Sequence, residues 1–168
     1  MQRCGKQKEY LMKVINLRDR PALFTASTTL GDILRESNWD RIIRTWVDTD
    51  TKGAKSIITY AWKFKNETVL EATTKYGDKE TVALMGMNGK TGEVYHMGMD
   101  NKGTHTLGKW KFKESEAVLE LAFAMAQGNE DSLRVTYRLE DNDTMIVTVD
   151  LPEPIIFKWI RLKNEELQ

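Results

Sequence analysis

The chain is poor in the residue types on which disulfide frameworks, metal sites and nucleic-acid binding depend. Its 168 residues include one cysteine, Cys4, two histidines and three prolines. A single cysteine cannot form an intrachain disulfide, so we expect an ordinary hydrophobic core to hold the fold. Lys and Arg number 25, and so do Asp and Glu. We expect no nucleic acid as a partner, because neutralising a phosphate backbone requires a basic excess.

Long apolar runs are also missing. No stretch approaches the ~20 apolar residues of a membrane-spanning helix. The opening residues, Met1 to Lys6, lack the apolar segment of a signal peptide. We therefore expect a cytoplasmic protein without a membrane span. The alternative is an exported or lipid-anchored protein, if the gene product is longer and a removed leader precedes Cys4.

The sequence contains none of the common catalytic motifs. It has no Ser-His-Asp spacing, Gly-rich phosphate loop, HExxH or CxxC. The segment 88–92 (NGKTG) is typical of a hairpin turn, since a phosphate loop should open a helix. Of the two histidines, we expect His105 to be solvated and His96 to point out of the fold. We therefore expect no metal, no cofactor and no catalytic residues, and binding rather than catalysis.

Short alternating apolar runs make up the chain from Ser56 onwards, separated by clusters rich in Gly, Asn and Asp. This pattern predicts an antiparallel β meander, because these residues tolerate the backbone of tight hairpins. About ten strands should close into a barrel, since closure removes exposed strand edges. The expected strands are 45–47, 56–64, 68–74, 81–87, 93–99, 104–112, 117–126, 132–139, 144–149 and 155–162.

The region before the strands predicts two short helices. Residues 28–35 and 38–44 carry apolar side chains at helical spacing. Thr29 or Ser37 could cap such a helix with a side-chain oxygen. We divide the chain into an N-terminal extension of uncertain structure, residues 1–27, and a barrel domain with leading helices, residues 28–168.

Two residues near opposite ends of the barrel region carry a family resemblance. Trp46 begins the first strand and Arg161 lies in the last one. The pair resembles the calycin kernel, in which a tryptophan closes the barrel floor and a late arginine stacks across it; Arg44 stands where the family has glycine. Segments 83–88, 92–100 and 107–110 are similar to a bacterial lipocalin-like domain family of unknown function. The resemblance spans roughly residues 30–162 and implies an up-and-down lipocalin-like barrel in which Arg161 makes a cation–π contact with Trp46.

Strand alternation places aromatic and methionine side chains on faces that should point into the barrel. Two interpretations remain open. The interior could hold a small hydrophobic or amphipathic ligand, or side chains could fill it completely. We take the following residues as candidates for ligand binding: Tyr60, Trp62, Tyr95, Met97, Met99, Trp110 and Phe123.

The outer faces of some strands are also apolar, in 82–87 and 118–126. Barrel exteriors are normally solvated, so either the N-terminal helices or another subunit should cover these faces. The alternative function is therefore a structural or interaction module. In it, a filled barrel would form a homodimer through Met85, Val118 and Ala122.

Overall fold

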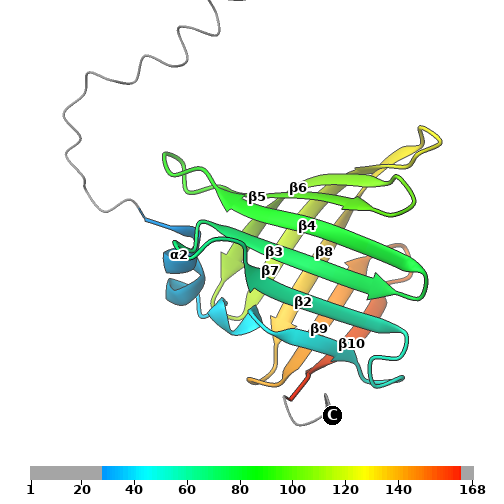
Figure 1. The fold of residues 1–168 in the computed structure, drawn as a ribbon, viewed down its shortest axis with the longest axis horizontal. Coiled ribbons are helices and arrows are strands. Elements are labelled where there is room, and N and C mark those ends of the chain that lie inside the picture. The colour runs from blue at the N-terminus through cyan, green and yellow to red at the C-terminus, as the bar shows by residue number, and fades with distance from the viewer. Residues whose placement is uncertain (1–27, 164–168) are drawn as a thin grey trace, which may run out of the picture.

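Ten antiparallel strands form one closed barrel in the computed structural model, which describes residues 28–163 (Figure 1). Each strand pairs with its neighbour in sequence, and β1 closes the barrel against β10. This confirms the predicted mainly β, up-and-down barrel. The strands are β1 (Thr45–Asp48), β2 (Ser56–Trp62), β3 (Val69–Tyr76), β4 (Lys79–Met87), β5 (Val94–Asp100), β6 (His105–Lys113), β7 (Glu116–Ala124), β8 (Glu130–Leu139), β9 (Thr144–Asp150) and β10 (Ile155–Arg161).

The strand bounds differ from the predicted ones by at most two residues. The turns explain this agreement. Several of them need a backbone conformation with positive φ, so glycine marks their positions in the sequence. Gly77, between β3 and β4, has a φ of 59°, and Gly103, between β5 and β6, has a φ of 86°. These values lie in the left-handed region that glycine enters at no steric cost. The predicted extension, residues 1–27 with Cys4, lies outside the described residues.

A short α-helix and one 3₁₀ turn precede the barrel: α2 (Leu30–Glu36) and η1 (Asp40–Ile42). Thr29 caps α2 as predicted: its hydroxyl accepts a bond from the Asp32 N–H at 3.2 Å, and the Asp32 carboxylate accepts one from the Thr29 N–H at 2.8 Å. Ser37 begins no helix. Its hydroxyl instead donates to the Ile33 carbonyl at the end of α2.

The helical segments pack over one end of the barrel, which we call the closed end (Figure 1). Two tryptophans fix this packing through their indole N–H groups. Trp39 donates to the Lys113 carbonyl at 2.7 Å, and Trp46 donates to the Ile42 carbonyl at 2.9 Å. Both rings are almost fully buried. The opposite end carries the β1–β2, β3–β4 and β9–β10 turns, and we call it the open end.

Strand pairing defines which residues face the interior, because residues directly opposite each other in an antiparallel pair share a face. One such row crosses the sheet from β2 to β8, and its apolar members belong to or pack against the core. The row consists of Trp62, Leu70, Met85, His96, Gly108, Leu121 and Leu133. His96 therefore points inwards, and the outward orientation that we predicted for it is wrong.

Candidate binding cavity

An open cavity of about 350 Å³ lies on the inner face at the open end of the barrel. This volume is near the lower bound of small-molecule sites, which measure roughly 300 to 1,000 Å³. Apolar side chains dominate its walls, and hydroxyl groups lie among them. The lining residues are Ser56, Ile58, Thr74, Tyr76, Lys79, Thr81, Val135, Tyr137, Val147, Val149, Phe157 and Trp159.

Three buried polar atoms of inward-facing residues have no hydrogen-bond partner within residues 28–163. They are the Trp159 Nε1, the Trp110 Nε1 and the His96 Nδ1. An unpaired buried donor or acceptor costs about 1 to 3 kcal/mol, so native structures rarely leave one without a partner. Trp159 lines the cavity. The interior thus offers an N–H donor that no described protein group satisfies.

Two buried tyrosines meet beside the cavity. The Tyr60 and Tyr137 hydroxyls interact with each other, and Tyr137 lines the cavity. Burial raises the pKa of both groups, that of Tyr60 well above its ordinary value. Both hydroxyls therefore stay protonated at neutral pH and can act as hydrogen-bond donors.

An ion pair lies at the mouth of the cavity. The Lys79 Nζ is 2.8 Å from the Asp100 Oδ2, and the Asp100 side chain is only 3% exposed. Burial by itself raises the pKa of Asp100, but hydrogen bonds from Lys79 and from the backbone N–H groups of Thr104 and Lys102 outweigh it and lower that pKa. The pair thus places a polar, charge-balanced group beside the apolar walls.

Four of the seven candidate ligand-binding residues face the interior, but none of the seven lines this cavity. Tyr60 interacts with Tyr137, which lines the cavity, but does not line it itself. Trp62 borders a concavity at the closed end, Trp110 one beside α2, and Phe123 one between β6 and β8. Half of the lining residues come from the last three strands, which we did not select. Their alternation, with Val147 and Val149 in β9 and Phe157 and Trp159 in β10, was the signal that could have identified them.

The other three candidates lie on β5 and point out of the barrel. Tyr95 is 40% exposed, Met97 51% and Met99 63%, so the inward orientation that we predicted for them is wrong. The other set of residues in β5, which includes His96 and Gly98, faces inwards because the interior there has little room. A Cβ at Gly98 would lie 2.6 Å from the Thr106 Oγ1. A glycine therefore occupies this position on the inner face of β5, and the large apolar side chains occupy its outer face.

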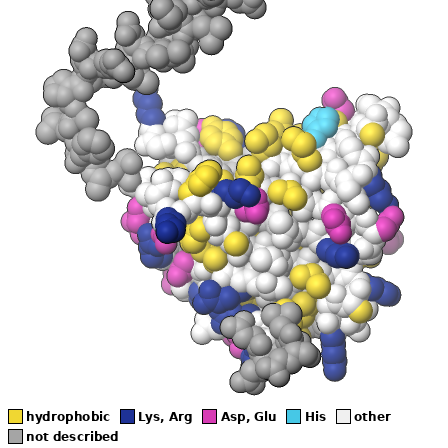
Figure 2. Space-filling view, viewed as in Figure 1, with side chains coloured by type: hydrophobic (Ala, Val, Ile, Leu, Met, Phe, Trp, Pro, Cys, Tyr) yellow, Lys and Arg dark blue, Asp and Glu magenta, His cyan; other side chains and the backbone are white. Residues whose placement is uncertain are grey.

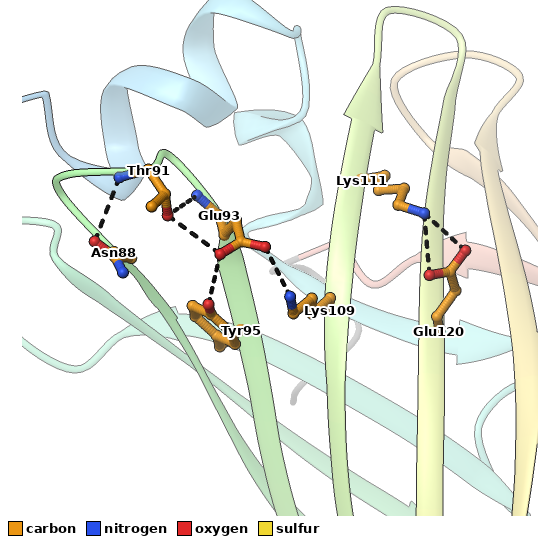
Figure 3. A network of polar contacts seen from close by, with 7 residues as sticks. All are labelled: Asn88, Thr91, Glu93, Tyr95, Lys109, Lys111 and Glu120. Carbon is orange, nitrogen blue, oxygen red and sulfur yellow. Dashed lines mark hydrogen bonds and ion pairs between the residues drawn. The ribbon is translucent and has the colours of Figure 1, made fainter.

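A polar network on the outer surface holds Tyr95 in this orientation (Figure 3). The Tyr95 hydroxyl donates to the Glu93 carboxylate at 2.7 Å, and the Lys109 Nζ lies 2.7 Å from the same carboxylate. The ammonium group of Lys109 also lies 5.3 Å from the centre of the Tyr95 ring. The hydrogen bonds from Lys109 and Tyr95 lower the pKa of Glu93 to about 2. Tyr95 is thus engaged in a surface network.

His96 is held inside the barrel as a neutral ring. Its Nε2 lies 3.2 Å from the Thr106 hydroxyl, and its ring centre lies 6.4 Å from that of Trp110. Burial lowers the pKa of His96 to about 4. His105 is exposed, as predicted. Within residues 28–163, no three His, Cys, Asp or Glu side chains gather as they would around a metal ion.

The predicted dimer surface is partly wrong. Met85 is 2% exposed and Val118 is 4% exposed, so neither can contact a second subunit. Other apolar residues on the outer face of β4, β5 and β6 are open to solvent, and Figure 2 shows hydrophobic side chains gathered over these strands. The helical segments pack at the closed end and leave this face uncovered. We call these residues the outer apolar patch: Val82, Met97, Met99 and Leu107.

The two residues of the predicted kernel are neighbours. Trp46 pairs directly with Arg161 across β1 and β10. The Arg161 guanidinium, however, lies 3.2 Å from the Asp143 carboxylate. Among the described residues, the cation–π contact is that of Lys109 with Tyr95. The pairing is thus as expected, and the expected stacking is replaced by an ion pair.

Comparisons with known proteins add no family assignment. No family model matches the chain, and no curated protein matches its sequence. No helix within residues 28–163 is long and apolar enough to cross a membrane. The fold is consistent with a lipocalin-like barrel through its ten antiparallel strands and up-and-down order.

Proposed function

We propose that the protein binds a small hydrophobic or amphipathic ligand, without catalysis, in the cavity at the open end of the barrel. The single observation that carries this proposal is an apolar cavity of about 350 Å³ lined by Trp159, whose buried Nε1 has no hydrogen-bond partner among the described residues. A closed barrel is also what the resemblance to the bacterial lipocalin-like family implies. The proposal includes membership of that family.

The chemistry of the walls favours one class of ligand. Val147, Val149 and Phe157 offer apolar surface, and burial of apolar area is the main source of affinity in such sites. The Trp159 N–H needs an acceptor, which a carbonyl, ether or hydroxyl oxygen of the ligand would supply. We therefore expect an apolar ligand that carries at least one hydrogen-bond acceptor.

The titratable groups around the cavity favour binding over catalysis. Acid–base catalysis works best when the pKa of a group lies near the operating pH. Burial raises the pKa of Tyr137. The hydrogen bond from Lys79 to Asp100 helps to lower the pKa of Asp100. Neither group is therefore poised to exchange a proton near neutral pH.

The test is a titration with N-phenyl-1-naphthylamine, a neutral apolar fluorophore. We expect saturable binding with enhanced emission, and a melting midpoint that rises with dye concentration. Val149→Trp should abolish binding because it fills the cavity. Thr148→Trp is the matched control, since Thr148 is the neighbouring residue and points outwards. Equal binding by the two variants, or no saturable binding by the wild type, would contradict the proposal.

A second function is favoured by the outer apolar patch. Val82 is directly paired with Met99, and Met97 with Leu107, so the four side chains form one continuous exposed surface. The occupant that we propose is a second copy of the chain, because two copies of an exposed apolar patch can bury each other across a two-fold axis and the zero net charge does not oppose this. The melting midpoint should then rise with protein concentration, and Met99→Lys should remove that dependence. A midpoint independent of concentration would refute the dimer.

A further inference from the structure

A second concavity, of about 500 Å³, lies at the closed end of the barrel, away from the proposed ligand cavity. It is bounded by α2, η1, the β2–β3 loop, the β8–β9 turn and the end of β10. Four arginines and two acidic residues take part in its lining. We call it the arginine pocket, and it consists of Arg35, Asp40, Arg41, Ile43, Arg44, Trp62, Glu67, Asn142 and Arg161.

The arginines of this pocket differ in how far their charge is compensated. Arg35 is bonded to two carboxylates, those of Asp32 and Glu67. Arg161 has one carboxylate partner, Asp143, at 3.2 Å. A carboxylate on each of these arginines leaves little net charge there. Within residues 28–163, the guanidinium groups of the lining without an ion-pair partner are therefore those of Arg41 and Arg44.

Arg41 and Arg44 have no carboxylate within 4.0 Å among the described residues. Arg41 donates to the Asn38 carbonyl at 3.0 Å and to the Asn142 side-chain oxygen at 3.2 Å. Arg44 donates to the carbonyl of Ile43 at 2.8 Å. All these acceptors are neutral. Two guanidinium groups of the lining therefore have no ion-pair partner in the described part of the chain, and the carboxylate of Asp40 lies in the same lining.

Arg161 adds a separate observation. Its Nε is buried and has no hydrogen-bond acceptor among the described residues. A charged N–H group without an acceptor in a buried position is costly, and native structures generally supply a partner. An oxyanion that draws the Arg161 guanidinium towards the pocket would supply one. Arg161 lines the same concavity as the two arginines that have no ion-pair partner among the described residues.

We propose that the arginine pocket binds an oxyanion of the phosphate class, held by Arg41, Arg44 and Arg161. Guanidinium groups match the oxygens of such an anion in geometry and charge. Ile43 and Trp62 also line the pocket and provide an apolar wall for the organic group to which the phosphate is attached. The expected ligand is a phosphate monoester. This inference is independent of the interior cavity.

Asp40 gives the proposal a prediction of opposite sign. It is the acidic residue of the lining that forms no ion pair among the described residues, so its carboxylate opposes the approach of an anion. Removing a guanidinium should weaken binding, whereas removing this carboxylate should strengthen it. A structural effect of the substitutions would not produce that pattern.

The experiment is an isothermal titration of the full chain with phenyl phosphate and with inorganic phosphate at low ionic strength. We expect Arg41→Gln and Arg44→Gln each to weaken phenyl phosphate binding by about tenfold, the loss of one charge-assisted contact. Asp40→Asn should strengthen it severalfold. Arg134→Gln, at an exposed arginine elsewhere on β8, is the control for charge alone and should bind as the wild type does.

Vesicles distinguish the source of the phosphate. Co-sedimentation with phosphatidic acid vesicles, but not with phosphatidylcholine vesicles, would identify a lipid headgroup. Binding of phenyl phosphate in solution without vesicle binding would identify a soluble ester. Both results support the pocket if Arg44→Gln weakens them and Arg134→Gln does not. No saturable binding of any of these probes by the wild type, or equal binding by Arg44→Gln and Arg134→Gln, would overturn the proposal.

Discussion

Trp46 and Arg161 lie directly opposite each other in the strand pair that closes the barrel. The Trp46 ring is fully buried, and its N–H group is bonded to the Ile42 carbonyl in η1. Arg161 reaches from the same place to Asp143 in the β8–β9 turn. The two residues thus connect the first strand, the last strand, η1 and a hairpin turn.

Arg161→Ala should therefore destabilise the fold. It removes the ion pair with Asp143 and the packing of the arginine stem, whose side chain is 23% exposed. We expect the free energy of unfolding to fall by about 1 to 3 kcal/mol. Arg134→Ala is the control: this arginine is 53% exposed, and its loss should cost less than about 1 kcal/mol. Urea denaturation measures both, and equal effects would show that Arg161 has no special role in closure.

Gly108 in β6 tests how closely β6 and β7 approach each other, and Gly86 in β4 is its control. A Cβ at Gly108 would lie 2.3 Å from the backbone oxygen of Glu120, whereas one at Gly86 would meet nothing within 4 Å. Because backbone must move to relieve the first contact, Gly108→Ala should destabilise by about 1 to 3 kcal/mol. Gly86→Ala should be neutral or slightly stabilising. Thermal unfolding of both variants checks the contrast, which would be absent if the strands were further apart.

The sequence was sufficient to predict the strands but not every face of the barrel. Turn residues such as Gly77 and Gly103 mark the strand ends locally, so the strand bounds could be predicted within two residues. The orientation of β5 could not be predicted in this way. Both sets of alternate residues in β5 contain apolar side chains, and the choice between them depends on the space left by Trp110 and Thr106 on the next strand.

The residues that line the cavity could not be predicted for a related reason. Alternation predicts that a residue faces the interior, but it does not predict whether neighbouring side chains fill the space in front of it. Tyr60 faces inwards, is 4% exposed and lies in the same core cluster as Tyr137. Trp159 also faces inwards, and it borders open space. Only the three-dimensional packing of β8, β9 and β10 distinguishes the two positions.

The buried histidine makes stability depend on pH. The pKa of His96 is lowered from 6.5 to about 4, so the folded state binds fewer protons than the unfolded state between these values. Stability should be complete above about pH 6.5 and should fall by about 2 to 3 kcal/mol as the pH drops towards 4. His96→Gln should remove this slope, and His105→Gln, at an exposed histidine, should keep it.

The measurement is urea denaturation at several pH values between 4 and 7. The carboxylates of Asp48 and Asp100, whose pKa values are lowered from 3.8, act mainly below this window and are present in every variant. Their effect therefore cancels when the variants are compared. An identical slope in the wild type and in His96→Gln would mean that His96 is solvated in the folded state.

Trp159→Phe tests whether the unpartnered indole N–H serves a ligand. Trp46→Phe is the matched control, because the Trp46 N–H is already bonded to the Ile42 carbonyl while that of Trp159 has no partner. Both changes remove the same atoms, but only Trp46→Phe breaks a hydrogen bond. Trp46→Phe should therefore cost about 1 kcal/mol more than Trp159→Phe in the absence of ligand.

Ligand affinity should respond to Trp159→Phe even though the stability of the free protein changes little. Prodan, a neutral naphthalene dye with a carbonyl acceptor, should bind Trp159→Phe about five- to tenfold more weakly than the wild type, because one hydrogen bond is lost. N-phenyl-1-naphthylamine has no comparable acceptor, and its affinity should change little. Fluorescence titration of both dyes gives the comparison. Equal losses of affinity for the two dyes would show that Trp159 contributes only its shape. The ligand would then not need a hydrogen-bond acceptor.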